Sequence, residues 1–213
     1  MSKNSHIGNS HPLTHPDPAP KPKKTPRQAR ARATFQAILE AAAHILQHSG
    51  PTALTTNLIA ERAGVSIGSL YQYFPSKDAI ISELIRELRR EMRDDILAMA
   101  QFVEGHPLDF TVQRMVRASI HHHVHTYGRA ELLERLEEHL PPDPETREIK
   151  AEINHIVTEL LRSHGVEHPA QAAFDLTNLV IGMAHPALHS GETDFEALAG
   201  RIDRAALGYL GRT

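Results

Sequence analysis

Apolar residues recur at intervals of three and four residues through almost the whole chain, and this spacing restricts its fold more than any other feature. The first such stripe ends at Gly50-Pro51 and consists of Phe35, Ile38, Leu39, Ala42, Ile45 and Leu46. Because an α-helix has about 3.6 residues per turn, residues at these intervals share one face. No segment shows the apolar and polar alternation that a half-buried strand needs. The spacing therefore predicts an all-α fold.

Glycine and proline residues divide this helical pattern into about nine helices. A first helix begins near Arg27 and ends before Gly50, two short helices follow it, and a long fourth helix runs to about Val103. The run Gly105-His106-Pro107 then breaks the pattern. The remaining amphipathic segments are expected at about 108–127, 130–139, 144–164, 168–189 and 194–210.

The N-terminal part of the chain differs from the rest in composition and charge. Residues 1–26 include six prolines between Pro12 and Pro26, which forbid a helix, so a disordered basic tail rich in Pro and His is predicted. Residues 1–77 hold nine Lys and Arg against three Asp and Glu, whereas residues 78–213 hold 14 against 23. A basic front end on an acidic body indicates that the front end alone binds a polyanion.

Several classes of function are disfavoured by what the sequence lacks. The chain has no cysteine, which excludes disulfides, thiolate zinc sites and cysteine nucleophiles. It has no run of roughly 18 apolar residues that could span a bilayer, so a cytoplasmic protein with no membrane partner is expected. A Gly-rich phosphate loop, a nucleophile elbow and a paired His-Glu motif are absent, so the chain is not expected to be an enzyme or to carry a cofactor. Glu137, Glu138 and His139 form a tempting cluster, but their short, highly charged helix is interpreted as solvent-facing.

The stretch from Thr55 to Lys77 carries the most specific signal. It predicts two helices of about two turns joined by a three-residue turn containing Gly64, which is the pattern of a helix-turn-helix. Thr55, Ser66 and Ser76 are the expected N-caps of the second, third and fourth helices. The small residues Ala60 and Ala63 allow these helices to approach closely, and Leu70 and Phe74, four residues apart, are expected to be buried.

The outward surface of the third helix suits DNA. Its residues are rich in hydroxyl and aromatic groups and include no acid, so they can contact phosphate and base edges in a major groove. Ile67 suits a thymine methyl group, and Lys77 at the start of the fourth helix can reach a phosphate. The alternative is an ordinary helical hairpin in which Tyr71 and Tyr73 belong to the core.

The segment from about Arg30 to Leu84 resembles the DNA-binding domain of the TetR family of transcriptional regulators. The most specific part is Ala63-Gly64-Val65-Ser66 through Leu70-Tyr71-Gln72-Tyr73-Phe74-Pro75-Ser76-Lys77. The resemblance implies a helix-turn-helix DNA-binding domain over 27–75 and a C-terminal helical bundle for ligand binding and dimerisation over 76–213. The residues then expected to contact double-stranded DNA are Arg30, Arg32, Thr56, Asn57, Ser66, Ile67, Gly68, Ser69, Tyr71, Gln72, Tyr73 and Lys77.

The resemblance also implies a homodimer that binds a palindromic operator and whose last two helices form a four-helix interface. The expected interface residues are Leu176, Leu179, Val180, Met183, Ala187, Leu198, Ile202, Ala205 and Tyr209. The alternative is that the apolar stripes formed by these residues on the last two helices pack inside a single subunit.

By the same resemblance, the chain is expected to be a repressor that a small effector releases from its operator. No charged residue clearly points into the predicted bundle, so the effector is expected to be mainly apolar. Each residue expected to line the effector pocket also fits an ordinary core position, and the set is Met99, Phe102, Met115, Ile120, His123, Tyr127, Ile156, Phe174 and Asn178. The alternative is a metal- or pH-responsive regulator using the cluster from His121 to His125, since His121 and His125 are four residues apart on one helix face. No carboxylate within one turn completes a third ligand, so no metal site is assigned.

Overall fold

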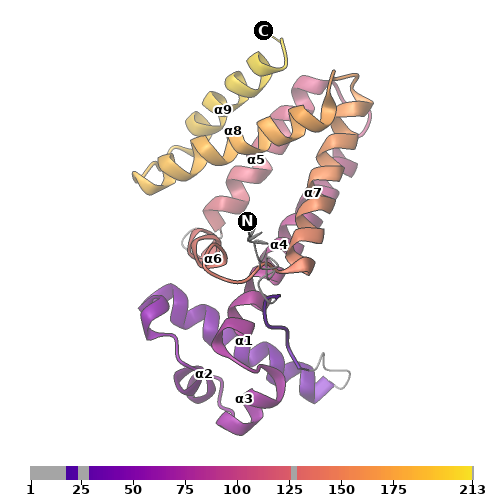
Figure 1. Cartoon of the computed structure of the whole chain (residues 1–213). Helices are drawn as coiled ribbons and strands as arrows, with labels where there is room; N and C mark the ends of the chain where they lie inside the picture. Colours follow the sequence, from indigo (N-terminus) through magenta and orange to yellow (C-terminus); the bar gives the residue numbers. More distant parts are fainter. Residues whose placement is uncertain (1–17, 24–28, 126–128, 213) are drawn as a thin grey trace, which may run out of the picture.

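The computed structural model describes residues 18–23, 29–125 and 129–212, without the side chains of residues 122–125, 129 and 131. In these ranges the chain forms nine α-helices, a single-turn 3₁₀ helix (Pro51–Ala53) and no strand. The first three helices form a compact group at one end of the molecule, and most of the other helices extend away from it (Figure 1). The helices are α1 (Ala29–Ser49), α2 (Thr56–Arg62), α3 (Ile67–Tyr73), α4 (Lys77–Phe102), α5 (Leu108–His125), α6 (Arg129–Glu137), α7 (Pro144–Ser163), α8 (Pro169–His189) and α9 (Phe195–Tyr209). None of the helices described is long and apolar enough to cross a membrane.

The predicted caps of the short helices are confirmed. Thr55 accepts a hydrogen bond from the backbone N–H of Leu58 at 3.2 Å, and Ser66 and Ser76 cap α3 and α4 in the same way. Each cap satisfies one of the N–H groups that the first turn of a helix leaves without an intrahelical partner. Gly64 has φ +66°, the left-handed conformation that turns the chain sharply after α2.

Two apolar cores hold the helices together. The first joins α1, α2 and α3 to the N-terminal half of α4 and to α6, and its fully buried members include Ile38, Ile59, Leu70, Phe74 and Ile80. The second joins α5, α8 and α9 to the end of α7. The first core continues past Pro75 through Leu88, so α4 and α6 pack directly on α1, which supports the helix-turn-helix.

Residues 18–23 depart from the prediction of a disordered tail. Ala19 is 3% exposed and its N–H donates a hydrogen bond to the carbonyl of Pro142 at 3.2 Å. The N–H of Lys23 donates to the carbonyl of Tyr73 at 2.7 Å. The prolines of this segment exclude a helix, as predicted, but they allow an extended segment that packs against the rest of the protein. We call residues 18–23 the N-terminal strap.

Arginines of α4 fasten this helix to α6 and α7. Arg86 is fully buried and donates two hydrogen bonds to Asp143, Nε to Oδ2 at 2.7 Å and Nη2 to Oδ1 at 3.1 Å, and a third to Glu83 at 2.8 Å. Burial alone would raise the pKa of Asp143, but the hydrogen bonds from Arg86 and Thr146 and the guanidinium charge outweigh it and hold this pKa below its ordinary value. The α6–α7 turn is thereby tied to the middle of α4.

The Glu137 cluster has a structural explanation. Glu137 pairs with Arg89 of α4 at 3.0 Å and with Lys150 of α7 at 2.5 Å. Its burial would raise its pKa, but the hydrogen bonds from Lys150 and Arg89 lower it on balance. The prediction that this end of α6 faces solvent is therefore wrong for Glu137, which bridges two helices.

Candidate nucleic-acid interface and internal cavity

The helix-turn-helix predicted from the sequence is present, and α2 and α3 present one shared polar surface. The hydroxyl groups of Thr56 and Tyr71 lie 3.2 Å apart and link the start of α2 to the middle of α3. Ser66 accepts the N–H of Ser69 at 3.0 Å, and the two serine hydroxyl groups lie 2.8 Å apart. These contacts fix the direction of the hydroxyl groups before any ligand arrives, which reduces the ordering cost of binding.

Most of the residues predicted to contact DNA are exposed. Ile67 is 39% and Tyr71 42% exposed, although both are large and apolar or aromatic. This exposure disagrees with the alternative in which Tyr71 is a core residue. Both side chains are therefore accessible to another molecule. The remaining exposed members of the predicted set are Arg30, Arg32, Asn57, Ser66, Gly68, Gln72 and Lys77.

Three predicted contact residues lie partly inside the domain. Thr56, Ser69 and Tyr73 are half-buried. The ring of Tyr73 meets the ring of Phe35 edge-on with centroids 6.2 Å apart, and it packs against the first core. For Tyr73 the core alternative therefore holds in part, because its ring supports α3 as well as lining its surface.

Gly68 has a backbone that any residue could adopt and no crowding from its own protein. A Cβ atom added there would meet only the Ser66 hydroxyl, at the ordinary distance of 3.8 Å. The fold therefore does not require glycine at this position. A missing side chain on an exposed recognition surface allows another molecule's backbone to approach closely.

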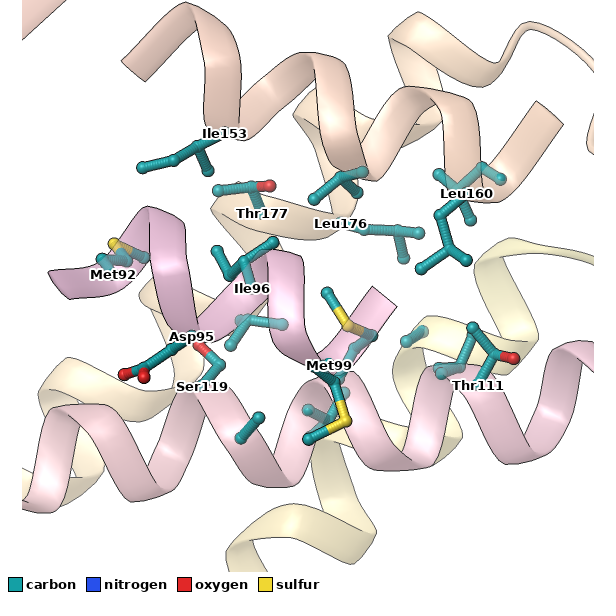
Figure 2. A pocket seen from close by; sticks show the side chains of 18 of the residues that line it. Met92, Asp95, Ile96, Met99, Thr111, Ser119, Ile153, Leu160, Leu176 and Thr177 are labelled. Atoms are coloured by element: carbon teal, nitrogen blue, oxygen red, sulfur yellow. The ribbon is translucent and has the colours of Figure 1, made fainter. Parts of the chain in front are cut away.

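A cavity of about 120 Å³ lies between α4, α5, α7 and α8. Met92, Asp95 and Ser119 lie at one end and Thr111 and Leu160 at the other (Figure 2). Most of the wall is apolar, and the polar groups are Asp95, Thr111, Ser119 and Thr177. Its apolar lining consists of Met92, Ile96, Met99, Val112, Met115, Val116, Ala118, Ile153, Val157, Leu160, Leu161, Leu176, Val180, Ile181 and Ala206.

The structure places the predicted pocket residues in several different environments. Met99 and Met115 line the cavity, and Ile120 is buried in the second core without lining it. Phe102 and Phe174 are 56% and 61% exposed and do not line it. Ile156 and Asn178 also lie outside the lining, and the side chains of His123 and Tyr127 fall outside the described residues. Phe102, Ile156, Phe174 and Asn178 are thus not among the residues that line the cavity, contrary to the prediction.

Sequence reasoning missed the α4 contribution to this wall apart from Met99. Met92, Ile96 and Met99 follow the spacing i, i+4, i+7 and form one stripe on α4. That spacing was a usable signal. The contributions of Ile153 and Leu160 were not readable, because they depend on which face of α7 meets α4.

The predicted dimer residues divide between the inside and the outside of the subunit. Leu176, Val180, Leu198 and Ile202 are buried in the second core, and the first two also line the cavity. The contacts described for these four side chains therefore lie inside one subunit. Tyr209 is 47% exposed, and the half-buried members of the set are Leu179, Met183, Ala187 and Ala205.

The histidine cluster carries no complete ligand set in the part of the chain that is described. His121 is exposed, and the side chains of His122, His123 and His125 are outside the described residues. Among the side chains that are described, no group of three or more His, Asp or Glu residues could hold a metal.

Comparisons with known proteins find sequence similarity over part of the chain and similarity of fold over most of it. Residues 38–84 match the family model described as "Bacterial regulatory proteins, tetR family". The HTH-type transcriptional repressor KstR of Mycolicibacterium smegmatis is 39% identical over 83 residues, which cover 38% of this chain and 41% of the relative. The HTH-type transcriptional regulator BetI of Agrobacterium fabrum is 38% identical over 63 residues, which cover 30% of this chain and 31% of the relative. The matched part thus spans less than half the length of these curated relatives.

Solved structures resemble the chain over most of its length. The fatty acid degradation regulator FadR from Bacillus halodurans has a TM-score of 0.67 at 17% identity, covering 86% of this chain and 97% of that one. The transcriptional regulator FadR from Bacillus subtilis, solved in complex with stearoyl-CoA, has a TM-score of 0.63 at 15% identity, covering 81% and 97%. At these identities the similarity concerns the fold.

Proposed function

We propose that the chain belongs to the TetR family of bacterial regulatory proteins, whose family model matches residues 38–84. We further propose that it is a sequence-specific transcriptional regulator that binds operator DNA as a homodimer. The observation that carries this proposal is the exposed face of α3 on a capped helix-turn-helix. Ile67, Gly68 and Tyr71 are offered to the major groove, and Asn57 and Lys77 flank them at the starts of α2 and α4. We further propose that it acts as a repressor in the cytoplasm, where its DNA target lies.

The chemistry of α3 supports reading of bases as well as binding of phosphate. Hydroxyl groups and helix N-termini contact phosphate and fix the register on the duplex, whereas groups that reach base edges specify sequence. Ile67 offers an apolar contact to a thymine methyl, and Gln72 offers an amide that can pair with adenine. Arg30 and Arg32, exposed in the first turn of α1, add charge on the same domain.

We propose that the effector is small and mainly apolar and binds in the cavity between α4, α5, α7 and α8. The largely apolar wall supports this ligand class. A cavity of about 120 Å³ is smaller than the roughly 300–1,000 Å³ of typical ligand pockets, so a larger effector has to displace side chains. Met92, Met99 and Met115 suit this because unbranched thioether side chains repack easily. The similar fold solved with stearoyl-CoA supports a ligand with an apolar chain.

Binding in the cavity has a direct structural route to α3. Met92, Ile96 and Met99 are on α4, whose first residue, Lys77, lies beside the recognition helix. A shift of this helix would change the position of α3 in each subunit and hence the spacing of the two half-site contacts. A coupling of this kind is typically worth about 1–3 kcal/mol.

For the homodimer we propose the outer face of α8 together with α9 as the interface. Phe174 and Tyr209 are largely exposed there, and the Tyr209 hydroxyl donates a hydrogen bond to Asp175 at 2.6 Å, joining the two helices. A two-fold axis would place an equivalent apolar face opposite Phe174. Two copies are also what a palindromic operator requires.

The alternatives receive less support. The enzyme hypothesis rested on the Glu137 cluster, which is occupied by ion pairs with Arg89 and Lys150. The curated relatives that match are regulators. A metal- or pH-responsive mode through His121–His125 is not favoured, because among the described side chains no group of three or more His, Asp or Glu residues could hold a metal.

Selection of random duplex DNA on the purified full-length chain tests the proposed function. We expect enrichment of a palindrome whose half-site centres lie about one helical turn apart, as two α3 helices on one face of the duplex require. Enrichment should survive Phe102→Ala, a control that removes an exposed aromatic ring of α4 far from α3. Failure to enrich any sequence, with binding that depends on salt alone, would overturn the proposal.

A further inference from the structure

The N-terminal strap, residues 18–23, contacts the α6–α7 turn at one end and the recognition helix α3 at the other. At one end, the N–H of Ala19 donates to the carbonyl of Pro142 in the α6–α7 turn at 3.2 Å. At the other end, the N–H of Lys23 donates to the carbonyl of Tyr73, the last residue of α3, at 2.7 Å. The strap therefore links the end of α3 to the α6–α7 turn, in addition to α4 and to the packing of α6 on α1.

The sequence of the strap makes this link stiff. Pro20 and Pro22 alternate with Lys21 between the two anchored residues, and Pro18 precedes them. Each proline fixes its φ near −65° and has no N–H that would need a partner. Proline-rich segments of this kind extend at about 3.1 Å per residue and act as semi-rigid spacers, so the four steps from Ala19 to Lys23 span about 12 Å.

The strap's contact with α3 satisfies a group that the helix cannot satisfy itself. The last four carbonyls of an α-helix have no intrahelical donor, and Tyr73 is the C-terminal residue of α3. Its carbonyl receives the N–H of Lys23 instead. The strap thus supports α3 at the end opposite its Ser66 cap.

The strap's other contact lies where α4, α6 and α7 meet. Pro142 directly precedes Asp143, the N-cap of α7, whose carboxylate accepts two hydrogen bonds from the buried Arg86 of α4. Ala19 is itself only 3% exposed, so this end of the strap is packed as well as hydrogen-bonded. A displacement of the α6–α7 turn would move the strap and, through it, the end of α3.

We infer that residues 18–23 are a positioning element that holds the recognition helix to the α6–α7 turn in parallel with α4. The inference rests on the proposed function for its consequence, since the element sets how α3 is presented to DNA. It is distinct from a phosphate-binding role of Lys21 and Lys23, because the two links to the fold are made by backbone N–H groups.

A matched pair of full-length variants separates these two roles. Lys23→Ala removes the side-chain charge and keeps the N–H, whereas Lys23→Pro removes both. We expect Lys23→Pro to bind the selected operator about fivefold more weakly than Lys23→Ala, the value of one net backbone hydrogen bond, with the same salt dependence. Without DNA, hydrogen exchange at the Tyr73 and Phe74 amides should also be faster in Lys23→Pro.

Two N-terminal deletions, compared by hydrogen exchange, give a second test that does not depend on inserting a proline. Deleting residues 1–17 keeps the strap, and deleting residues 1–23 removes it, while Lys21→Ala/Lys23→Ala in the full chain removes only its charges. We expect the 1–23 deletion alone to increase exchange both at the end of α3 and at Thr146 in the first turn of α7.

The outcomes are distinguishable from failure of the proposed function. Two results together would overturn the positioning role: equal hydrogen exchange in Lys23→Pro and Lys23→Ala, and a 1–23 deletion that behaves like Lys21→Ala/Lys23→Ala. The lysine charges would then be the strap's only contribution. If the wild-type chain selects no duplex, the proposed function fails, and the exchange measurements still decide whether the strap holds α3.

Discussion

Replacing Arg86 by Met tests the buried ion pair that ties α4 to the α6–α7 turn. The Arg86 side chain is 0% exposed, and those of Glu83 and Asp143 are 10% and 9% exposed. Removing one partner of a buried pair typically costs about 3–5 kcal/mol because the other charge is left uncompensated. We expect the lower end, about 3 kcal/mol, since Glu83 keeps Arg90 and Asp143 keeps the hydrogen bonds from Thr146.

Thermal and urea unfolding at fixed protein concentration and pH 7 measure this loss. For a chain of this size about 3 kcal/mol corresponds to a fall in Tm of about 6–12 °C. Arg93→Met is the matched control on the same helix, because Arg93 and its partners Asp94 and Glu152 are 30%, 65% and 48% exposed and such pairs are worth about 0–1 kcal/mol. Arg86→Met/Asp143→Asn removes the uncompensated carboxylate, so its loss should be smaller than the sum of the two single losses.

The loss should also depend on pH with a defined sign. The pKa of Asp143 is lowered in the folded protein, so its ionised form contributes stability above its ordinary pKa, near 4, and this contribution is lost as pH falls further. The difference between wild type and Arg86→Met should therefore shrink below about pH 4. A loss under about 1 kcal/mol at pH 7, or one independent of pH, would refute the reasoning and assign Arg86 a packing role only.

Two further predictions concern the DNA surface and the cavity. Lys77→Gln should make the slope of log affinity against log salt shallower by about 0.9 for each phosphate that is no longer neutralised, as measured by anisotropy titrations. Lys150→Gln, a control in the C-terminal part of the chain, should leave this slope unchanged. A salt slope equal to wild type in Lys77→Gln would remove that residue from the phosphate contacts. Benzene is known to fit a cavity of about 150 Å³, so we expect it to bind in the cavity of about 120 Å³ and to raise the Tm of the wild type. Met99→Trp should fill this cavity and abolish that rise in Tm. Stabilisation by benzene that persists in Met99→Trp, or is lost equally in Phe102→Leu, would show that this cavity is not where the probe binds.

The local signals in the sequence predicted the helix-turn-helix in detail. Thr55, Ser66 and Ser76 cap the expected helices, and Gly64 takes the left-handed conformation that the turn needs. These features depend on a few neighbouring residues. A single sequence therefore contains nearly all the information that determines them.

The features that the sequence did not predict depend on contacts between distant segments. Arg86 and Asp143 are 57 residues apart, and in sequence Arg86 is indistinguishable from a solvated charge on a long helix. On α8, both faces carry apolar residues, so the sequence could not decide that Val180 faces the core and Phe174 faces outward. The strap was missed because a proline-rich composition excludes a helix but does not exclude an extended segment that packs.

The most direct test of the account is a titration of the selected palindrome and a scrambled duplex with the wild-type chain and Tyr71→Ala, with stoichiometry measured by sedimentation. Tyr71 is 42% exposed at the centre of α3, and a good base contact is worth about 1–3 kcal/mol per half-site. We predict two subunits per palindrome and a loss of at least about tenfold in Tyr71→Ala on the palindrome, with scrambled DNA bound as before. Equal weakening on both duplexes, or one subunit per palindrome, would contradict sequence reading by a pair of recognition helices.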